Sequence, residues 1–139
     1  MKSVKRHLSL ICVVALVLAI MVPTVFAATT GYNYTYDFNL GSGGSKTYNG
    51  KTENALWYPG DGSGTWSIYV NGNSNTSVSS AKLYYIRSFN TDVAVKTMSS
   101  IDRGSSDSDS FVGIDGKTYY AVITAKTNEG VYGTTNLSQ

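Results

Sequence analysis

The sequence predicts an all-β fold: a single antiparallel β-sandwich of about seven or eight strands, with a small β-barrel as the alternative. Apolar and polar residues alternate without interruption over residues 32–40. Runs rich in β-branched and aromatic residues then recur roughly every ten residues, separated by turn-forming residues. Beyond residue 27, no window combines an apolar period of about 3.6 residues with helix caps. Together these observations favour many short strands over helices.

The best-defined predicted strand covers residues 32–40. Its aromatic and aliphatic residues occupy every second position, from Tyr32 to Leu40, and Asn, Thr and Asp occupy the positions between them. A period of two residues is that of a strand with one buried face and one solvent-facing face. Composition predicts further strands over residues 65–70, 81–89, 92–98, 110–114, 117–126 and 130–134.

Three dipeptides predict tight turns between strands. They are Asn49-Gly50, Asn71-Gly72 and Asp115-Gly116. Asn-Gly and Asp-Gly adopt the positive φ angles that a two-residue type I′ turn requires. We therefore expect a β-hairpin at each, most clearly at Asp115-Gly116, where both flanks are rich in β-branched and aromatic residues.

Residues 1–27 predict a signal peptide, and residues 28–139 a secreted, extracellular domain. Three bases among the first six residues precede an apolar run that reaches residue 22, and residues 25–27 (VFA) form a cleavage-like triplet. The run is just long enough to span a bilayer as an uncleaved anchor, but a proline near its end and the triplet favour removal. We expect cleavage after Ala27 or Ala28. The short, lysine-led segment is typical of bacterial export.

Removal of the signal peptide changes the charge and the chemistry of the chain. Three of the eleven Lys and Arg leave with it, so eight bases face nine acids and the net charge becomes −1. The basic isoelectric point belongs to the precursor, and we expect no nucleic-acid partner. The single His and the single Cys also leave, so no residues remain for Ser-His-Asp or Cys-His catalysis, for an ordinary zinc site or for a disulfide.

We expect no enzymatic activity and no cofactor. The nine acids lie mostly in or beside predicted turns, and paired carboxylates for glycoside hydrolysis need a cleft that a single small sandwich rarely builds. Asp102, Asp107 and Asp109 lie in one serine-rich loop and form a weak calcium candidate. The pattern breaks at Phe111, where calcium would need another oxygen ligand. A solvated loop is therefore the favoured interpretation.

The aromatic residues are the strongest indication of function, with eleven Tyr and two Trp in the chain. Exposed rings offer rigid contact area, and sugars stack their C–H faces on them. Trp57, Tyr58 and Asp61 lie in a Pro- and Gly-containing segment and are the predicted ligand-binding residues. Neighbours in an extended segment point to opposite sides, so at least one of Trp57 and Tyr58 is expected to face outward. Trp66 shares a strand face with two aliphatic residues and is predicted to be core.

The same alternation applies to two Tyr-Tyr pairs, Tyr84-Tyr85 and Tyr119-Tyr120. Each pair is expected to place one ring on either face of its sheet. A sheet with tyrosines on its outer face is a surface for recognition or assembly.

We therefore expect a small, non-enzymatic binding protein that recognises cell-envelope or extracellular polysaccharide, or a surface protein, through exposed aromatics. In this interpretation only the signal peptide contacts a membrane. Two alternatives belong to other classes. Amphipathic strands such as residues 32–40 would suit a bacteriocin-like or membrane-active toxin, although they are barely long enough to cross a bilayer. Strand pairing between molecules would suit a self-assembling matrix protein.

Overall fold

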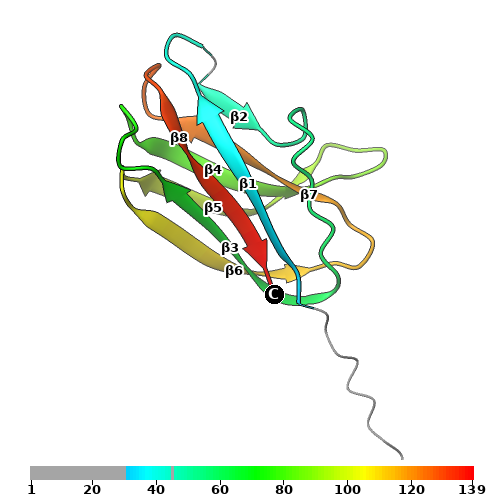
Figure 1. The fold of residues 1–139 in the computed structure, drawn as a ribbon. Helices are drawn as coiled ribbons and strands as arrows, with labels where there is room; N and C mark the ends of the chain where they lie inside the picture. The colour runs from blue at the N-terminus through cyan, green and yellow to red at the C-terminus, as the bar shows by residue number, and fades with distance from the viewer. Residues whose placement is uncertain (1–30, 45) are drawn as a thin grey trace, which may run out of the picture. The chain divides into compact units, whose positions relative to one another are not determined.

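The described part of the chain folds into eight strands (Figure 1). The computed structural model describes residues 31–44 and 46–139, and the predicted signal peptide lies outside them. None of the described residues belongs to a helix long and apolar enough to cross a membrane. In chain order the strands are β1 (Asn33–Leu40), β2 (Thr47–Asn49), β3 (Gly62–Val70), β4 (Val78–Tyr85), β5 (Val93–Ile101), β6 (Ser106–Gly113), β7 (Tyr119–Ala125) and β8 (Val131–Ser138).

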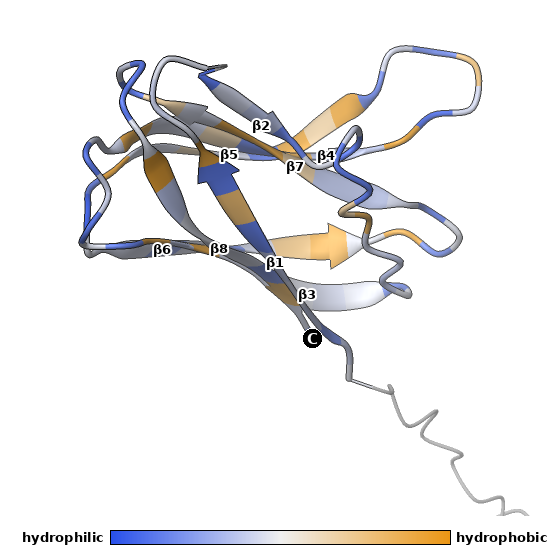
Figure 2. Ribbon diagram, turned by 45° about the horizontal axis from the view of Figure 1, so that its top comes forward, coloured by the Kyte–Doolittle hydropathy of each residue, from blue (hydrophilic) through white to orange (hydrophobic). Residues whose placement is uncertain are grey.

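The strands form two four-stranded sheets that face each other as two layers (Figure 2). One sheet has the order β1-β8-β3-β6 and the other β2-β7-β4-β5, with antiparallel pairing throughout. We call them the β8 sheet and the β7 sheet, after a central strand of each. Eight strands divided in this way form a jelly roll. The predicted all-β sandwich is confirmed.

None of the three predicted hairpins forms. The strands on either side of Asn71-Gly72, β3 and β4, belong to different sheets, and so do β6 and β7 on either side of Asp115-Gly116. Strand β2, which ends at Asn49, pairs with β7 and not with the next strand. The chain still turns sharply, with Gly116 at a φ of 69°. At Asn71-Gly72 and Asp115-Gly116 the chain crosses to the other sheet, whereas after Asn49-Gly50 it stays beside β7 as far as Trp57.

The β4–β5 pair is the one place in the described residues where consecutive strands are hydrogen-bonded neighbours. The strand predicted over residues 81–89 ends earlier, at Tyr85, and residues 86–92 form the loop that joins β4 to β5. Apolar composition alone did not separate the strand from this loop.

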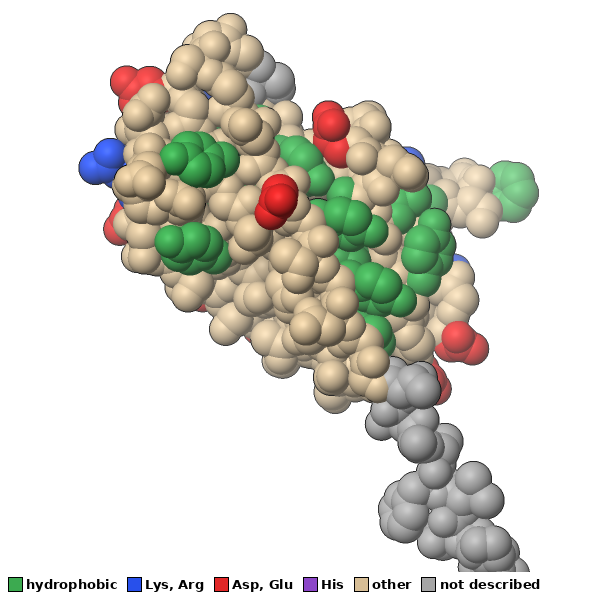
Figure 3. All heavy atoms as spheres, in the orientation of Figure 1, with side chains coloured by type: hydrophobic (Ala, Val, Ile, Leu, Met, Phe, Trp, Pro, Cys, Tyr) green, Lys and Arg blue, Asp and Glu red, His purple; other side chains and the backbone are tan. Residues whose placement is uncertain are grey.

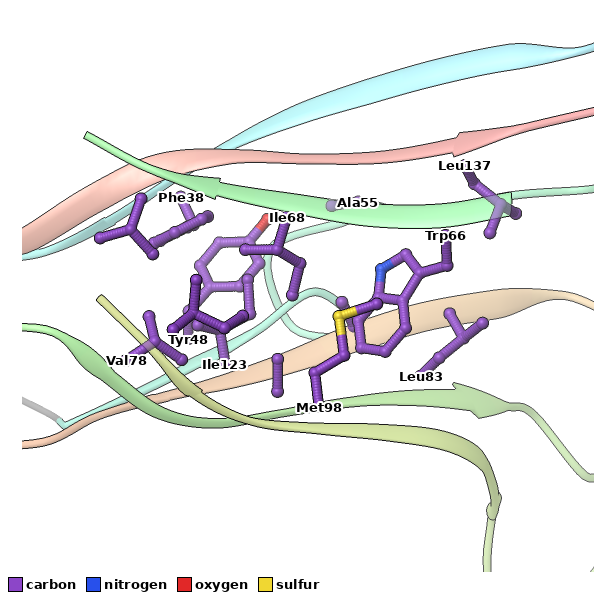
Figure 4. Close-up of a cluster of buried hydrophobic side chains, with 14 of the residues drawn as sticks. Phe38, Tyr48, Ala55, Trp66, Ile68, Val78, Leu83, Met98, Ile123 and Leu137 are labelled. Atoms are coloured by element: carbon purple, nitrogen blue, oxygen red, sulfur yellow. The ribbon is translucent and has the colours of Figure 1, made fainter. Parts of the chain in front are cut away.

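The hydrophobic core fills the space between the sheets. Trp66, Ile68 and Val70 of β3 are all buried, as their shared strand face predicts. They belong to one buried cluster with residues of the β7 sheet such as Leu83 and Ile123. Figure 4 shows Trp66, Ile68 and Leu83 among the side chains between the two layers of strands. Complete burial of one such side chain stabilises the fold by about 1.5–3 kcal/mol. Residues 31–139 thus form one compact unit with its own core.

The indole nitrogen of Trp66 is buried in this core and forms a hydrogen bond there. Trp66 Nε1 donates a hydrogen bond to Oγ1 of buried Thr135 at 3.0 Å. The Thr135 hydroxyl in turn donates to the carbonyl of Ser67 at 3.4 Å. The buried indole N–H and the buried hydroxyl are therefore both satisfied, which avoids a desolvation cost of about 1–3 kcal/mol for each.

Gly133 of β8 has no room for a side chain. A Cβ at this position would collide with the backbone oxygen of Tyr69 and lie 2.9 Å from the ring of Phe38. We expect Gly133→Ala to lower the free energy of unfolding by about 3 kcal/mol, measured by urea denaturation. The matched control is Gly41→Ala, since nothing lies within 4 Å of a Cβ there. Equal midpoints for the two variants would contradict the close approach.

Candidate functional site

The predicted ligand-binding segment pairs with β7 beyond the end of the short edge strand β2. The Trp57 N–H donates to the carbonyl of Tyr119 at 2.9 Å, and the Tyr119 N–H donates back to the carbonyl of Trp57 at 2.8 Å. This pairing fixes the alternation of side chains, so Trp57 turns inward and Tyr58 outward. Trp57 is 0% exposed and Tyr58 is 62% exposed. The expectation that one of the two faces outward is confirmed.

The structure corrects the prediction that Trp57 contacts a ligand. A ring with no exposed surface belongs to the core, where it packs against Tyr36 with a centroid distance of 5.6 Å. Its Nε1 is buried and has no hydrogen-bond partner among the described residues. Asp61 is exposed just before β3, and its carbonyl accepts a hydrogen bond from the Gln139 side chain at 3.5 Å. Tyr58 and Asp61 therefore remain at the surface as predicted candidates.

The three aspartates of the weak calcium candidate do not converge. Asp107 and Asp109 lie in strand β6 and not in a loop, because this serine-rich segment completes the ladder with β3. The Asp109 carboxylate pairs with Nζ of Lys96 at 3.2 Å, and Asp102 accepts a hydrogen bond from the Ser77 hydroxyl at 3.3 Å. Within residues 31–44 and 46–139, no three acidic, His or Cys side chains are placed to hold a metal ion.

The outer face of the β8 sheet is polar and almost uncharged. Side chains on each strand alternate between the core and this face, and the register aligns the outward ones in rows across the strands. One row joins Asp37, Thr134 and Tyr69. We call this surface the polar face; it consists of Asn33, Thr35, Asp37, Asn39, Ser63, Thr65, Ser67, Tyr69, Ser106, Ser108, Ser110, Val112, Tyr132, Thr134, Asn136 and Ser138. Asp37 is its only charged member.

Two tyrosines rise from the polar face. Tyr69 on β3 is 42% exposed and Tyr132 on β8 is 37% exposed. Tyr69 lies opposite Thr134, two residues from Tyr132, so the tyrosines are diagonal neighbours, an arrangement that typically places the Cα atoms about 7–8 Å apart. Figure 3 shows hydrophobic side chains on this side of the molecule, some isolated and some in a group, within a surface formed mostly by backbone and uncharged polar side chains. Between the tyrosines lies a hollow of about 280 Å³, the tyrosine hollow, whose other lining residues are Asp37, Phe38, Asn39, Asn71, Gly133 and Thr134.

A second hollow of about 360 Å³ lies between the edge strands β1 and β2, and we call it the edge hollow. It contains two carboxylates, from Asp37 and Glu53, beside the hydroxyl-bearing ring of Tyr48. Burial raises the pKa of the Tyr48 hydroxyl, and Glu53, Tyr36 and Asp37 raise it further by repulsion. The remaining lining residues are Asn39, Leu40, Gly41 and Thr47.

The Tyr-Tyr pairs divide as predicted between the two faces of the β7 sheet. Tyr84 and Tyr120 stack on the outer face, with ring centroids 5.4 Å apart and an angle of 12° between the planes. Tyr85 and Tyr119 meet on the core side at 6.1 Å. Tyr120 is nevertheless buried, so this stack is not an open platform for a ligand.

Asp92 and Lys51 both contact the Tyr120 side chain, with Lys51 Nζ 5.8 Å from the centre of its ring. The Asp92 carboxylate accepts hydrogen bonds from Lys51 Nζ at 2.7 Å, from the Tyr120 hydroxyl at 2.8 Å and from the Arg87 N–H at 3.1 Å. The bond from Lys51 and then that from Arg87 lower the pKa of the Asp92 carboxyl. Burial and then Asp92 raise the pKa of the Tyr120 hydroxyl. These contacts fasten the base of the β4–β5 loop to the sheet.

The tyrosines of the polar face were missed in the sequence analysis, although one signal for them was present. Trp66, Ile68 and Val70 share the core face, so Tyr69 between them must point outward. Tyr132 follows the buried Val131 and points outward for the same reason. The alternation did not indicate that β8 pairs with β3, and this pairing is what brings the two rings together.

No protein-family model matches the chain, and no curated protein is significantly similar to it in sequence. Among solved structures, it is similar to the Yersinia pseudotuberculosis-derived mitogen at 14% identity, with 77% of this chain and 83% of that chain covered and a TM-score of 0.43. A carbohydrate binding module of a Cellvibrio mixtus lichenase, solved with cellotriose, is similar at 10% identity, with 77% and 86% covered and a TM-score of 0.43. A C-terminal carbohydrate binding module of a Zobellia galactanivorans laminarinase is similar at 9% identity, with 78% and 99% covered and a TM-score of 0.43. Similarities this weak carry no conclusion about the ligand or the site of this chain.

The lowered pKa of Asp92 leads to a prediction about acid stability. An unfolded Asp has a pKa of about 3.9, so the folded carboxylate stabilises the protein above about pH 4, and this contribution disappears as the pH falls through the lower folded pKa. We expect Asp92→Asn to lower the free energy of unfolding at pH 7 by about 1 kcal/mol or more, and the difference from wild type to shrink below about pH 4. Urea denaturation between pH 2 and 7 measures this. Asp115→Asn, in an exposed turn, is the control and is expected to change little.

Proposed function

We propose that the protein is a secreted, non-enzymatic binding protein that recognises extracellular or cell-envelope polysaccharide on its polar face. The observation that carries this proposal is the tyrosine hollow, which the exposed side chains of Tyr69 and Tyr132 line together. Both rings project from strands inside the β8 sheet and not from loops, so their spacing is fixed by the register.

The chemistry of the tyrosine hollow suits a sugar. A sugar ring offers apolar C–H faces and a rim of hydroxyl groups. The ring of a tyrosine can stack on the C–H faces. Donors and acceptors for the sugar hydroxyl groups come from the carboxylate of Asp37, the amides of Asn39 and Asn71 and the hydroxyl of Thr134. An apolar ligand would leave these polar groups without partners, which favours a hydroxyl-rich one.

The end of the sandwich that carries residues 50–61, 86–92 and 114–118 favours a surface protein as a second candidate partner. Phe89 is 97% exposed in the β4–β5 loop, and Tyr58 is exposed in the segment before β3. Figure 2 shows hydrophobic positions in the loop that projects beyond the strands. Exposed aromatics at loop tips serve as anchors in protein interfaces. The toxin and matrix-protein alternatives stay predictions that liposome leakage and light scattering would test.

Export is the part of the proposal that rests on residues 1–27 alone. Expression of the full chain in a bacterial host is expected to release a protein whose N-terminal residue is Ala28 or Thr29, as read by N-terminal sequencing of the culture medium. Retention of the intact chain in the membrane fraction would support the uncleaved-anchor alternative instead.

Binding is tested with residues 28–139, which contain the whole core, sedimented with insoluble peptidoglycan, chitin, cellulose and other glucans. We expect the wild type to sediment with at least one polymer, and Tyr69→Ala or Tyr132→Ala to weaken this binding by at least about tenfold, or ~1.4 kcal/mol. Tyr58→Ala is the control, since it removes an exposed tyrosine of the predicted segment outside the polar face. Urea denaturation verifies that each variant is folded.

Loss of binding in Tyr58→Ala alone would place the site in the segment before β3 and not on the polar face. Sedimentation of the wild type with none of the polymers would remove the carbohydrate proposal and leave the surface protein as the candidate partner.

A further inference from the structure

The tyrosine hollow and the edge hollow meet at strand β1. Asp37 and Asn39 line both of them. Strand β1 is an edge strand of the β8 sheet, so no further strand of that sheet stands between its outward side chains and the edge hollow. The two hollows, of about 280 and 360 Å³, therefore adjoin at β1, and we call the surface that joins them over this strand the path. Both hollows are open to solvent, and side by side they offer contacts to more than one sugar unit of a chain.

The charged side chains along this path are both carboxylates. Asp37 stands where the hollows meet, and Glu53 lines the edge hollow only. No Lys or Arg is among the residues that line either hollow. The two ion pairs of the described residues involve neither Asp37 nor Glu53. Their negative charges therefore face the path without a cationic partner.

The hydroxyl of Tyr48 responds to these charges. After burial, the repulsion of Glu53 is the next largest cause of the raised pKa of Tyr48, and Asp37 acts in the same direction. A negative charge on a ligand in the edge hollow would experience the same repulsion. No third acidic, His or Cys side chain of the described residues joins these two carboxylates, so a bridging cation is not favoured.

A carboxylate without a cationic partner is a strong acceptor for sugar hydroxyl groups, because hydrogen bonds to a charged acceptor are stronger than those between neutral groups. The same carboxylate repels the carboxylate or sulfate of an acidic polysaccharide. We infer that the ligand is an extended chain of uncharged sugars that crosses β1 and occupies both hollows, and that acidic polysaccharides are rejected. This inference rests on the proposed function, since it names the class of polysaccharide for that same site.

Affinity gel electrophoresis of residues 28–139 tests the charge of the ligand with two pairs of polymers, each with one neutral and one acidic member. Hydroxyethyl cellulose is compared with carboxymethyl cellulose, which has the same backbone, and glucomannan is compared with polygalacturonate. At low ionic strength we expect the neutral polymers to bind at least about tenfold more tightly than the acidic ones. The difference is expected to narrow in 1 M salt, where the Debye length falls to about 3 Å.

Variants of the two carboxylates test the path. Glu53→Ala is expected to weaken binding of a neutral polymer severalfold, although it lies outside the tyrosine hollow. Asp37→Asn keeps a hydrogen-bonding group of the same shape, so we expect it to retain neutral binding within about threefold and to gain binding of the acidic polymers. Asp115→Asn makes the same change of charge in the β6–β7 turn and is expected to alter neither.

The possible outcomes separate the inference from the proposed function. Binding of an acidic polymer as tight as that of its neutral partner at low ionic strength would overturn the charge class. Wild-type affinity in both Glu53→Ala and Glu53→Lys would overturn the path across β1. If none of the four polymers and none of the sedimented polysaccharides binds, the proposed function itself falls.

Discussion

The insertion of β8 between β1 and β3 is the constraint on which the rest of the structure depends. It joins the last strand of the chain to the first, so the β8 sheet exists only when residues about a hundred positions apart have paired. Leu137 of β8 is fully buried in the core, and Thr135 accepts the hydrogen bond of the buried Trp66 indole. Gly133 makes the pairing possible because a larger residue would collide with the backbone of β3.

The same strand builds the candidate site with its other face. Tyr132 and Thr134 point away from the core and stand between the polar side chains of β1 and the Tyr69 ring of β3. Core and site are therefore two sides of one ladder. A site of this kind is rigid, because its side chains stand on strands whose register the core enforces.

Charge is distributed unevenly over the two sheets. On the β7 sheet, the ion pair of Lys51 and Asp92 holds the base of the β4–β5 loop against the sheet and contacts Tyr120. The polar face carries one carboxylate and is otherwise made of hydroxyl and amide groups with two tyrosines. A surface with so little charge interacts through hydrogen bonds and ring contacts, whose specificity depends on shape and spacing more than on attraction at a distance.

The sequence by itself determined the fold class, the strand at residues 32–40, the core position of Trp66 and the outward turn of one member of each aromatic pair. These follow from a period of two residues, which is a local property of the backbone. Only the tertiary structure decided which strands are neighbours. For that reason none of the predicted hairpins forms, and Trp57, which was predicted to contact a ligand, is buried beside β7. The local turn chemistry of Asn-Gly and Asp-Gly is the same whether the chain returns in its own sheet or crosses to the other. Which distant strands pair with each other depends on the burial of two complete sheet faces against each other. No short window of sequence contains that information.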